Sequence, residues 1–125
     1  MADITPPVSA DSQIIQGYGD GGFRIAGQDY VGSVIVTALE TSSWDITTVD
    51  RIDIDSLLTT LKRVPDLTVL QLGTGSSMTP PAPELRTKLR ATGIGLEFMD
   101  TGAACRTFNV LLAEERSAAA ALIAT

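Results

Sequence analysis

The sequence contains no histidine among its 125 residues. Histidine is the commonest metal ligand in proteins and the commonest general base near neutral pH. Its absence excludes the serine and cysteine triads that depend on imidazole. The chain also has a single cysteine, Cys105, so it forms no internal disulfide and no Cys-x-x-Cys redox pair. One cysteine fits a reducing compartment.

Positive charge is scarce as well. The formal net charge is −6 and the isoelectric point is about 4.4, whereas nucleic-acid binders usually present a basic face to the phosphates. We therefore expect no nucleic-acid partner. The charge is uneven, with −7 on residues 1–61 and +1 on residues 62–125. An acidic face for a basic partner is one interpretation, and acidic turns that keep the protein soluble are the simpler one.

Long apolar runs are missing too. No run approaches the roughly 20 residues that a membrane-spanning helix needs, so we expect no transmembrane segment. The start of the chain, MADITPPVSADSQ, lacks the basic and apolar segments of a secretory signal and the arginines of a mitochondrial transit peptide. These features predict a cytoplasmic protein.

The composition that remains predicts one folded domain. Hydrophobic residues make up 44% of the chain and charged residues 19%, which suits a single globular core. Pro6 and Pro7 interrupt regular structure near the start. We therefore expect residues 1–12 to be a flexible tail and residues 13–125 to form a single α/β domain.

Strands are predicted where β-branched or alternating apolar residues recur. Residues 23–25 alternate, and the tight turn at 26–29 after them is typical of a β-hairpin. Glycines at 17, 19, 21 and 22 are expected to break the chain before that hairpin. The predicted strands cover residues 13–16, 23–25, 30–31, 33–39, 41–46 around Trp44, 68–72 and 94–99.

Three helices are predicted from end signals. Asp53 or Asp55 can cap a helix over about residues 54–62. Pro83 suits the first turn of a second helix, which Gly93 would end. Thr101 can cap a third helix that runs to about residue 115. Strands that alternate with these helices, after an N-terminal block of strands, predict an α/β domain whose sheet is partly parallel and partly antiparallel.

The last stretch, residues 117–124, is ambiguous from composition. Four consecutive alanines favour a helix by propensity. Its apolar character also fits an edge strand. Both interpretations remain open on the residues alone.

The turn Gly73-Thr74-Gly75 is the first candidate site. A glycine turn between a strand and a helix can bind phosphate through backbone amides. However, Met78 stands where a dinucleotide motif needs its third glycine, the lysine of a Walker motif is absent, and nearby prolines remove amides. Glycines that only permit a tight turn are the simpler interpretation.

The second candidate follows the next strand. Asp100 and Thr101 should lie at the same edge as the glycine turn, because parallel strands end there, and open α/β sheets bind ligands at that edge. The simpler interpretation is that Asp100 and Thr101 only cap and start a helix. Cys105 could be a reactive thiol beside Arg106, or a buried apolar residue. Arg106 and Asn109 could bind a partner, or Arg106 could pair with an acid such as Asp100.

Four stretches together resemble one known family. They are LQLGTG at 70–75, PELR at 83–86, MDTGAACRTFNVLLAEER at 99–116 and AAAALI at 118–123. The combined pattern resembles an uncharacterised bacterial domain family that includes mitochondrial complex I (NADH dehydrogenase) assembly factor 3. The resemblance extends from the hairpin near Gly22 onward.

The resemblance implies a single compact three-layer α/β domain. It would have a central mixed sheet with N-terminal antiparallel strands and a C-terminal half that runs strand, helix, strand, helix, strand, so that residues 117–124 form a strand. The resemblance implies no established enzymatic activity, cofactor, metal or catalytic residue. The eukaryotic member acts through protein contacts while a respiratory complex is assembled.

We therefore expect a non-enzymatic protein-binding domain, an assembly factor or chaperone-like accessory of respiratory complex I. Its partners would be respiratory-complex subunits or assembly proteins, and a homodimer through an exposed strand edge is a further alternative. The competing hypothesis is a small-molecule- or anion-binding protein, or a weak enzyme, at the same sheet edge. The candidate surface residues are Gly73, Thr74, Gly75, Asp100, Thr101, Cys105, Arg106 and Asn109.

Overall fold

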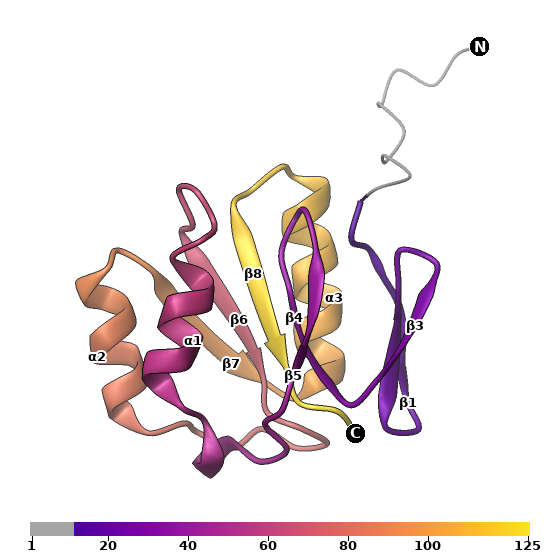
Figure 1. Ribbon diagram of the computed structural model, residues 1–125, viewed down its shortest axis with the longest axis horizontal. Helices are drawn as coiled ribbons and strands as arrows, with labels where there is room; N and C mark the ends of the chain where they lie inside the picture. The colour runs from indigo at the N-terminus through magenta and orange to yellow at the C-terminus, as the bar shows by residue number, and fades with distance from the viewer. Residues whose placement is uncertain (1–11) are drawn as a thin grey trace.

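The chain folds into three layers in its computed structural model, which describes residues 12–125 (Figure 1). A five-stranded sheet forms the middle layer. Two helices cover one face, and the third helix with a separate three-stranded sheet covers the other. The predicted three-layer α/β class is confirmed. The tail predicted at residues 1–12 lies, apart from Ser12, outside the described residues.

The small sheet contains β1 (Ile15–Gly19), β2 (Gly22–Ile25) and β3 (Gln28–Val31), all antiparallel in that order. The predicted hairpin of β2 and β3 is confirmed. The predicted break at the first glycines is wrong, because β1 runs through Gly17 to Gly19 and pairs with β2. The chain turns only after Gly19. A β-bulge between Ile15 and Gly17 accommodates the glycine within the strand.

The central sheet has the order β5-β4-β8-β6-β7. Its strands β6, β7 and β8 are parallel, whereas β4 pairs antiparallel with both β5 and β8. Mixed pairing of this kind is what the sequence predicted. The bounds are Ser33–Val36 for β4, Thr41–Trp44 for β5, Val69–Gly73 for β6, Gly95–Met99 for β7 and Ala118–Leu122 for β8.

Strand β4 ends three residues earlier than predicted. The Thr37 amide donates to the Glu40 carbonyl, and the Thr37 hydroxyl accepts from the amides of Leu39 and Glu40. These bonds close a turn at the end of β4. Threonine and serine hydroxyls that bond nearby amides compete with strand pairing in this way, which the β-branched composition alone did not reveal.

Strand β8 occupies the centre of the sheet, between β4 and β6. Its side chains alternate between the two faces. Ala119 and Ala121 pack in the core with the first two helices, whereas Ala118, Ala120 and Leu122 pack in the core with the third. The strand implied by the family resemblance is therefore confirmed, and all five of its residues are buried.

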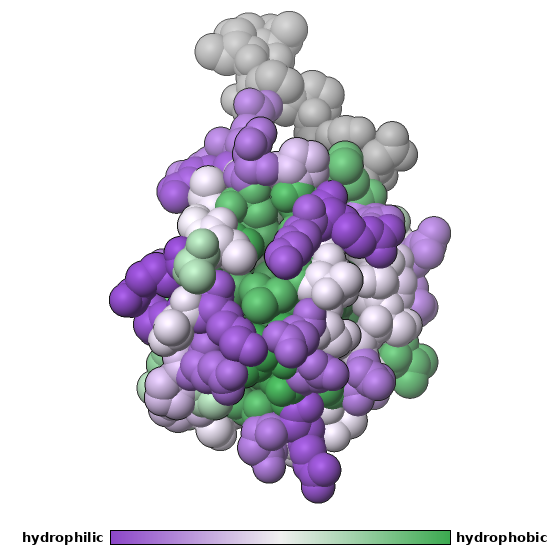
Figure 2. Space-filling model, turned by 60° about the vertical axis from the view of Figure 1, so that its left-hand side comes forward, coloured by the Kyte–Doolittle hydropathy of each residue, from purple (hydrophilic) through white to green (hydrophobic). Residues whose placement is uncertain are grey.

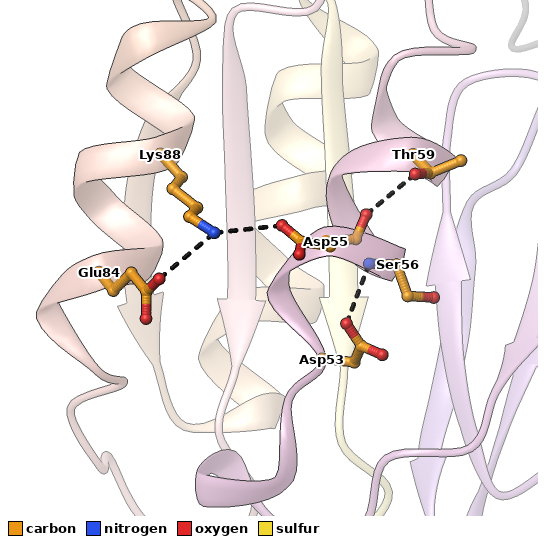
Figure 3. A network of polar contacts seen from close by, with 6 residues as sticks. All are labelled: Asp53, Asp55, Ser56, Thr59, Glu84 and Lys88. Atoms are coloured by element: carbon orange, nitrogen blue, oxygen red, sulfur yellow. Dashed lines mark hydrogen bonds and ion pairs between the residues drawn. The ribbon is translucent and has the colours of Figure 1, made fainter.

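Helices α1 (Ile54–Leu61) and α2 (Pro83–Ala91) cover one face of the sheet. The carboxylate of Asp53 caps α1 by accepting from the Ser56 amide at 3.1 Å. Lys88 joins the two helices, because its ammonium lies 3.1 Å from a carboxylate oxygen of Asp55 and 3.3 Å from one of Glu84 (Figure 3). These partners raise the pKa of Lys88, led by the hydrogen bond to Asp55.

Helix α3 (Thr101–Ala113) covers the opposite face together with the small sheet. Phe108 is its largest fully buried side chain. It packs among Phe23 and Ile25 of β2 and Val34 and Val36 of β4. This arrangement places the first turn of α3 directly beside the ends of the parallel strands.

Candidate functional site

The two predicted turns meet at the carboxyl ends of β6 and β7. The Thr74 amide donates to the Met99 carbonyl at 2.9 Å, and the Thr101 amide donates to the Gly75 carbonyl at 2.8 Å. The Gly75 amide in turn donates to the Thr101 hydroxyl at 2.9 Å. The prediction that both turns share one sheet edge is confirmed.

Thr101 also holds the end of β8. Its hydroxyl donates to the Ile123 carbonyl at 2.7 Å, and the Ile123 amide donates to the Gly73 carbonyl at 3.0 Å. The side chain of Thr101 is fully buried. Four residues from three segments thus form one bonded unit, the carboxyl-edge junction, which consists of Gly73, Gly75, Thr101 and Ile123.

Both glycines of the junction have structural reasons to be glycine. A Cβ on Gly73 would lie 3.0 Å from the Cα of Thr101 and 3.1 Å from Cδ2 of Leu122. Gly75 has a φ of 109°, a conformation that side chains disfavour. The tight-turn interpretation of these glycines therefore accounts for both of them.

Four of the backbone amides at this edge are already engaged. Those of Thr74, Gly75 and Thr101 donate within the junction, and that of Ala103 donates to the Asp100 carboxylate at 2.9 Å. The N-cap of α3 is accordingly Asp100, and the prediction that Thr101 caps the helix is wrong. Asp100 has the extended backbone of a cap, whereas Thr101 is the first helical residue and turns its hydroxyl toward β8.

Cys105 lies in the core and not at the surface. Its exposed fraction is 2%, and it packs in the cluster beneath α3. Burial raises the pKa of its thiol to about 12, which outweighs the opposite effect of the neighbouring Arg106. The thiol is therefore protonated at physiological pH, and Cys105 behaves as an apolar residue.

We expect the Cys105 thiol to resist thiol–disulfide exchange at pH 8 until the protein unfolds. Its pKa is raised from 9.0 to about 12, so above pH 9 the unfolded chain loses this proton while the native chain keeps it. Stability should consequently fall as the pH rises above 9. A chromogenic disulfide reagent measures the reaction, with Ser56→Cys, an exposed position on α1, as the reactive control. Rapid stoichiometric labelling of the native wild type would contradict the expectation.

Arg106 and Asn109 connect α3 to β1. The Asn109 amide group donates to the Ile15 carbonyl at 2.9 Å, and its oxygen accepts from the Ile15 amide at 2.9 Å. Asn109 thus occupies the outer edge of β1 as a neighbouring strand would. Arg106 donates to the Tyr18 hydroxyl at 2.8 Å. This bond takes the place of the suggested pairing between Arg106 and Asp100.

Tyr18 is a contact that the sequence prediction missed. It lies on β1, and its hydroxyl would be only 2.6 Å from a Cβ on Gly102. Glycine in the first turn of a helix is unfavourable by propensity, so Gly102 was the available sign of a close neighbour. That neighbour could not be identified from sequence spacing, because 84 positions separate the two residues.

Asn109→Ala should destabilise the protein by about 1–2 kcal/mol, because two partly buried hydrogen bonds to the backbone of Ile15 are lost. Arg106→Ala should cost well under 1 kcal/mol, since Arg106 bonds an exposed hydroxyl. Urea unfolding measures both values. Equal stability of the two variants would mean that Asn109 does not hold β1 in solution.

A groove of about 770 Å³ opens beside the carboxyl-edge junction. Three chain segments form its walls: the connection between β5 and α1, the loop between β6 and α2, and the end of the chain. Most of the polar side chains along it are hydroxyls, and three of its positions are prolines or alanine in the loop before α2. The lining residues are 47–50, 74–77, 79–82 and 123–125.

Of the eight candidate residues, Thr74 and Gly75 line this groove. Gly73 and Thr101 lie beneath it in the junction, and Asp100 caps α3. Cys105 belongs to the core, and Arg106 and Asn109 contact β1. The sequence prediction missed the wall at residues 47–50, because this segment gave no clear pattern. It contains the 3-10 turn Val49–Arg51.

The electrostatic character of the groove is acidic. Among residues 12–125, Asp50 is the one charged side chain in its lining, and no lysine or arginine of this part of the chain lines it. A hydrogen bond from the Thr48 side chain is the largest effect on Asp50 and lowers the pKa of its carboxyl group. The groove therefore favours neutral or cationic groups over anions.

Neither a metal cluster nor a membrane span is found within residues 12–125. No group of three or more histidine, cysteine, aspartate or glutamate side chains there is placed to hold a metal ion. None of the helices in this part of the chain is long and apolar enough to cross a bilayer.

Comparison with known proteins gives relatives and structural neighbours. The NADH dehydrogenase [ubiquinone] 1 alpha subcomplex assembly factor 3 of Xenopus tropicalis is 34% identical over 115 residues, which is 92% of this chain and 63% of that protein. The chain thus spans less than two thirds of the relative's length. A crystal structure described as an outer membrane protein from Bartonella henselae is 37% identical, with a TM-score of 0.82, and the match covers 92% of this chain and 97% of that one.

A solution structure from Bordetella pertussis, described as an Mth938-like domain, is similar over 98% of this chain and 92% of its own. It is 27% identical, with a TM-score of 0.79. The family model described as protein of unknown function (DUF498/DUF598) matches residues 15–123. That match spans all the strands and helices of the described residues, together with the junction and most of the groove, and the chain belongs to this family.

Proposed function

We propose that this domain is a non-enzymatic protein-binding module that acts as an assembly factor. We further propose that it contacts its partner through the groove beside the carboxyl-edge junction, which we call the carboxyl-edge groove. The observation that carries the proposal is the construction of the groove. Its floor is the bonded junction of β6, α3 and β8, and its walls are loops rich in hydroxyls and prolines. A fixed surface of this kind binds a partner with little ordering cost.

The names of the relatives support the assembly role. Several proteins that are 30–36% identical to this chain are named NADH dehydrogenase assembly factor 3. We infer that the partners of this chain are subunits or assembly proteins of a respiratory NADH dehydrogenase. We further propose that it acts in the cytoplasm, with a peripheral position at the inner face of the membrane as the alternative.

The chemistry of the edge supports binding more than catalysis. The thiol of Cys105 is buried and protonated, and the lowered pKa of the Asp50 carboxyl makes it a weak base. The engaged amides and the acidic lining disfavour an anion. The groove volume of about 770 Å³ nevertheless falls within the range of small-molecule sites, which keeps a neutral ligand as the second candidate.

Ser76→Tyr tests the proposed groove. Ser76 is exposed and lines the groove, so a tyrosine there should fill part of the space without entering the core. In cells that express the protein, the tagged wild type should co-purify subunits of NADH dehydrogenase, and Ser76→Tyr should reduce their recovery at least tenfold. Ser56→Tyr makes the same replacement at an exposed position on α1 and should leave recovery unchanged.

Melting temperature separates a lost contact from a lost fold. Both tyrosine variants should melt within about 2 °C of the wild type, since exposed substitutions usually change stability little. Recovery of the same subunits by Ser76→Tyr would remove the groove from the proposal. A neutral metabolite that raises the melting temperature of the wild type but not of Ser76→Tyr would favour the small-molecule alternative.

A further inference from the structure

Strand β7 forms one edge of the central sheet, with β6 on its inner side. The Gly95 amide donates to the Thr68 carbonyl, and the Met99 carbonyl accepts from the Thr74 amide. The backbone amides and carbonyls of residues 95, 97 and 99 therefore point toward β6. Backbone groups of alternate residues point to opposite sides of a strand. Leu96 and Phe98 therefore present their amides and carbonyls at the outer edge, where a further strand can pair.

A hollow of about 270 Å³ lies beside this edge. It is lined by Arg86 and Arg90 of α2 and by residues 93–96 at the start of β7. Two of those four residues are glycines, so the backbone is approachable there. Figure 2, which brings the α2 side of the molecule forward, shows an apolar strip between hydrophilic flanks. The edge thus offers backbone groups and positive charge together.

The two arginines are exposed on α2 and are one helical turn apart. Like charges at this spacing are mildly unfavourable. The ion pairs of α2 within the described residues belong to Lys88, which bridges Glu84 and Asp55 (Figure 3). The Arg86 guanidinium lies 5.9 Å from the centre of the Phe98 ring, which positions it over β7. An acidic group at this edge would relieve the repulsion.

The spacing of the arginines matches that of an extended chain. Residues four apart on a helix rise by about 6 Å along its axis, and alternate residues of a strand are about 6.6 Å apart. Two carboxylates at alternate positions of an added strand can therefore face Arg86 and Arg90. The positions between them would point to the other face of the sheet, on the side of Glu97, where acidic residues are disfavoured.

We propose that the outer edge of β7 binds an extended acidic segment of a partner protein as a sixth strand, with carboxylates at alternate positions facing Arg86 and Arg90. This surface is independent of the carboxyl-edge groove. A second copy of the chain paired through the same edge would bring its own Arg86 and Arg90 against these two. That like-charge contact disfavours a β7–β7 dimer.

A labelled nine-residue peptide of alternating glutamate and valine tests the proposal by fluorescence anisotropy. The wild type should bind it at low salt, and Arg86→Glu/Arg90→Glu should weaken binding at least tenfold. Arg86→Gln/Arg90→Gln removes the two positive charges without reversing them and should also weaken peptide binding. This variant keeps the test valid if Arg86→Glu/Arg90→Glu fails to fold. Arg24→Glu/Arg51→Glu carries the same change in charge on distant exposed residues and should bind as the wild type does.

Two further peptides separate strand pairing from charge alone. A peptide with N-methyl groups on alternate amides cannot form the ladder and should lose binding, and a lysine–valine peptide should not bind. The proposal is overturned if the N-methylated peptide binds as well as the parent, or if inorganic phosphate competes as effectively as unlabelled peptide. Sedimentation that shows a dimer abolished by Arg86→Glu/Arg90→Glu would assign the edge to a second copy instead. The Ser76→Tyr variant should bind the peptide normally, which keeps this result separate from the groove.

Discussion

Replacing Gly73 by alanine is expected to lower the free energy of unfolding by about 2–3 kcal/mol, and the melting temperature by about 10 °C. The new Cβ would lie 3.0 Å from the Cα of Thr101 and 3.0 Å from its hydroxyl oxygen. Neither neighbour can move freely, because the Thr101 hydroxyl bonds both Gly75 and Ile123. The strain should therefore spread through the junction and not be absorbed by one side chain.

Gly102→Ala is the matched control. Its Cβ would come still closer to a neighbour, 2.6 Å from the hydroxyl of Tyr18, but this neighbour is the far end of a side chain that is 46% exposed. Tyr18 can rotate away, and alanine favours the helix by up to about 1 kcal/mol. We expect a change in stability near zero. Urea unfolding of both variants measures the difference, and equal loss in the two would show that the junction is no more rigid than the surface.

The architecture could be predicted largely because its signals are local. Apolar periodicity, the cap at Asp53, the proline at position 83 and the glycine at position 93 each act within a few residues. Strand β8 was the exception, since four consecutive alanines favour a helix. Its central place explains the outcome: β4 and β6 pair with its two sides and helices cover both faces. Small side chains there let those helices approach the sheet, a constraint that propensity does not contain.

The site was predictable only in part for the same reason. The common edge of the two turns follows from strand direction, and it placed the turn at residues 73–75 correctly beside Thr101. The third segment of the junction, at Ile123, and the groove wall around Asp50 are brought in by the fold from more than 20 positions away along the chain. The internal roles of Arg106 and Asn109 depend on β1, more than 80 positions earlier. Contacts over such separations leave no pattern within a single sequence window.

Thr101→Val is expected to cost about 2–4 kcal/mol, although it conserves volume. Thr101 is fully buried, and its hydroxyl accepts from the Gly75 amide and donates to the Ile123 carbonyl. Valine would leave both backbone groups without this partner, and each buried unsatisfied group costs about 1–3 kcal/mol. Thr101→Ser keeps the hydroxyl and removes one methyl group, so it should cost only about 1 kcal/mol.

The same pair of variants connects the junction to function. Gly75 and Ile123 both line the groove, so loss of the hydroxyl should loosen its floor. The hollow beside residues 93–96 lies at the opposite end of β7 and should be unaffected. Hydrogen exchange should become faster at the Gly75 amide in Thr101→Val and stay slow in Thr101→Ser. At a temperature where both variants are folded, Thr101→Val should recover less NADH dehydrogenase than Thr101→Ser does. The Thr101 hydroxyl, at the start of α3, bonds the residues that follow β6 and β8. Equal stability and equal recovery of the two variants would therefore mean that the junction neither holds the sheet edge nor shapes the surface that the partner meets.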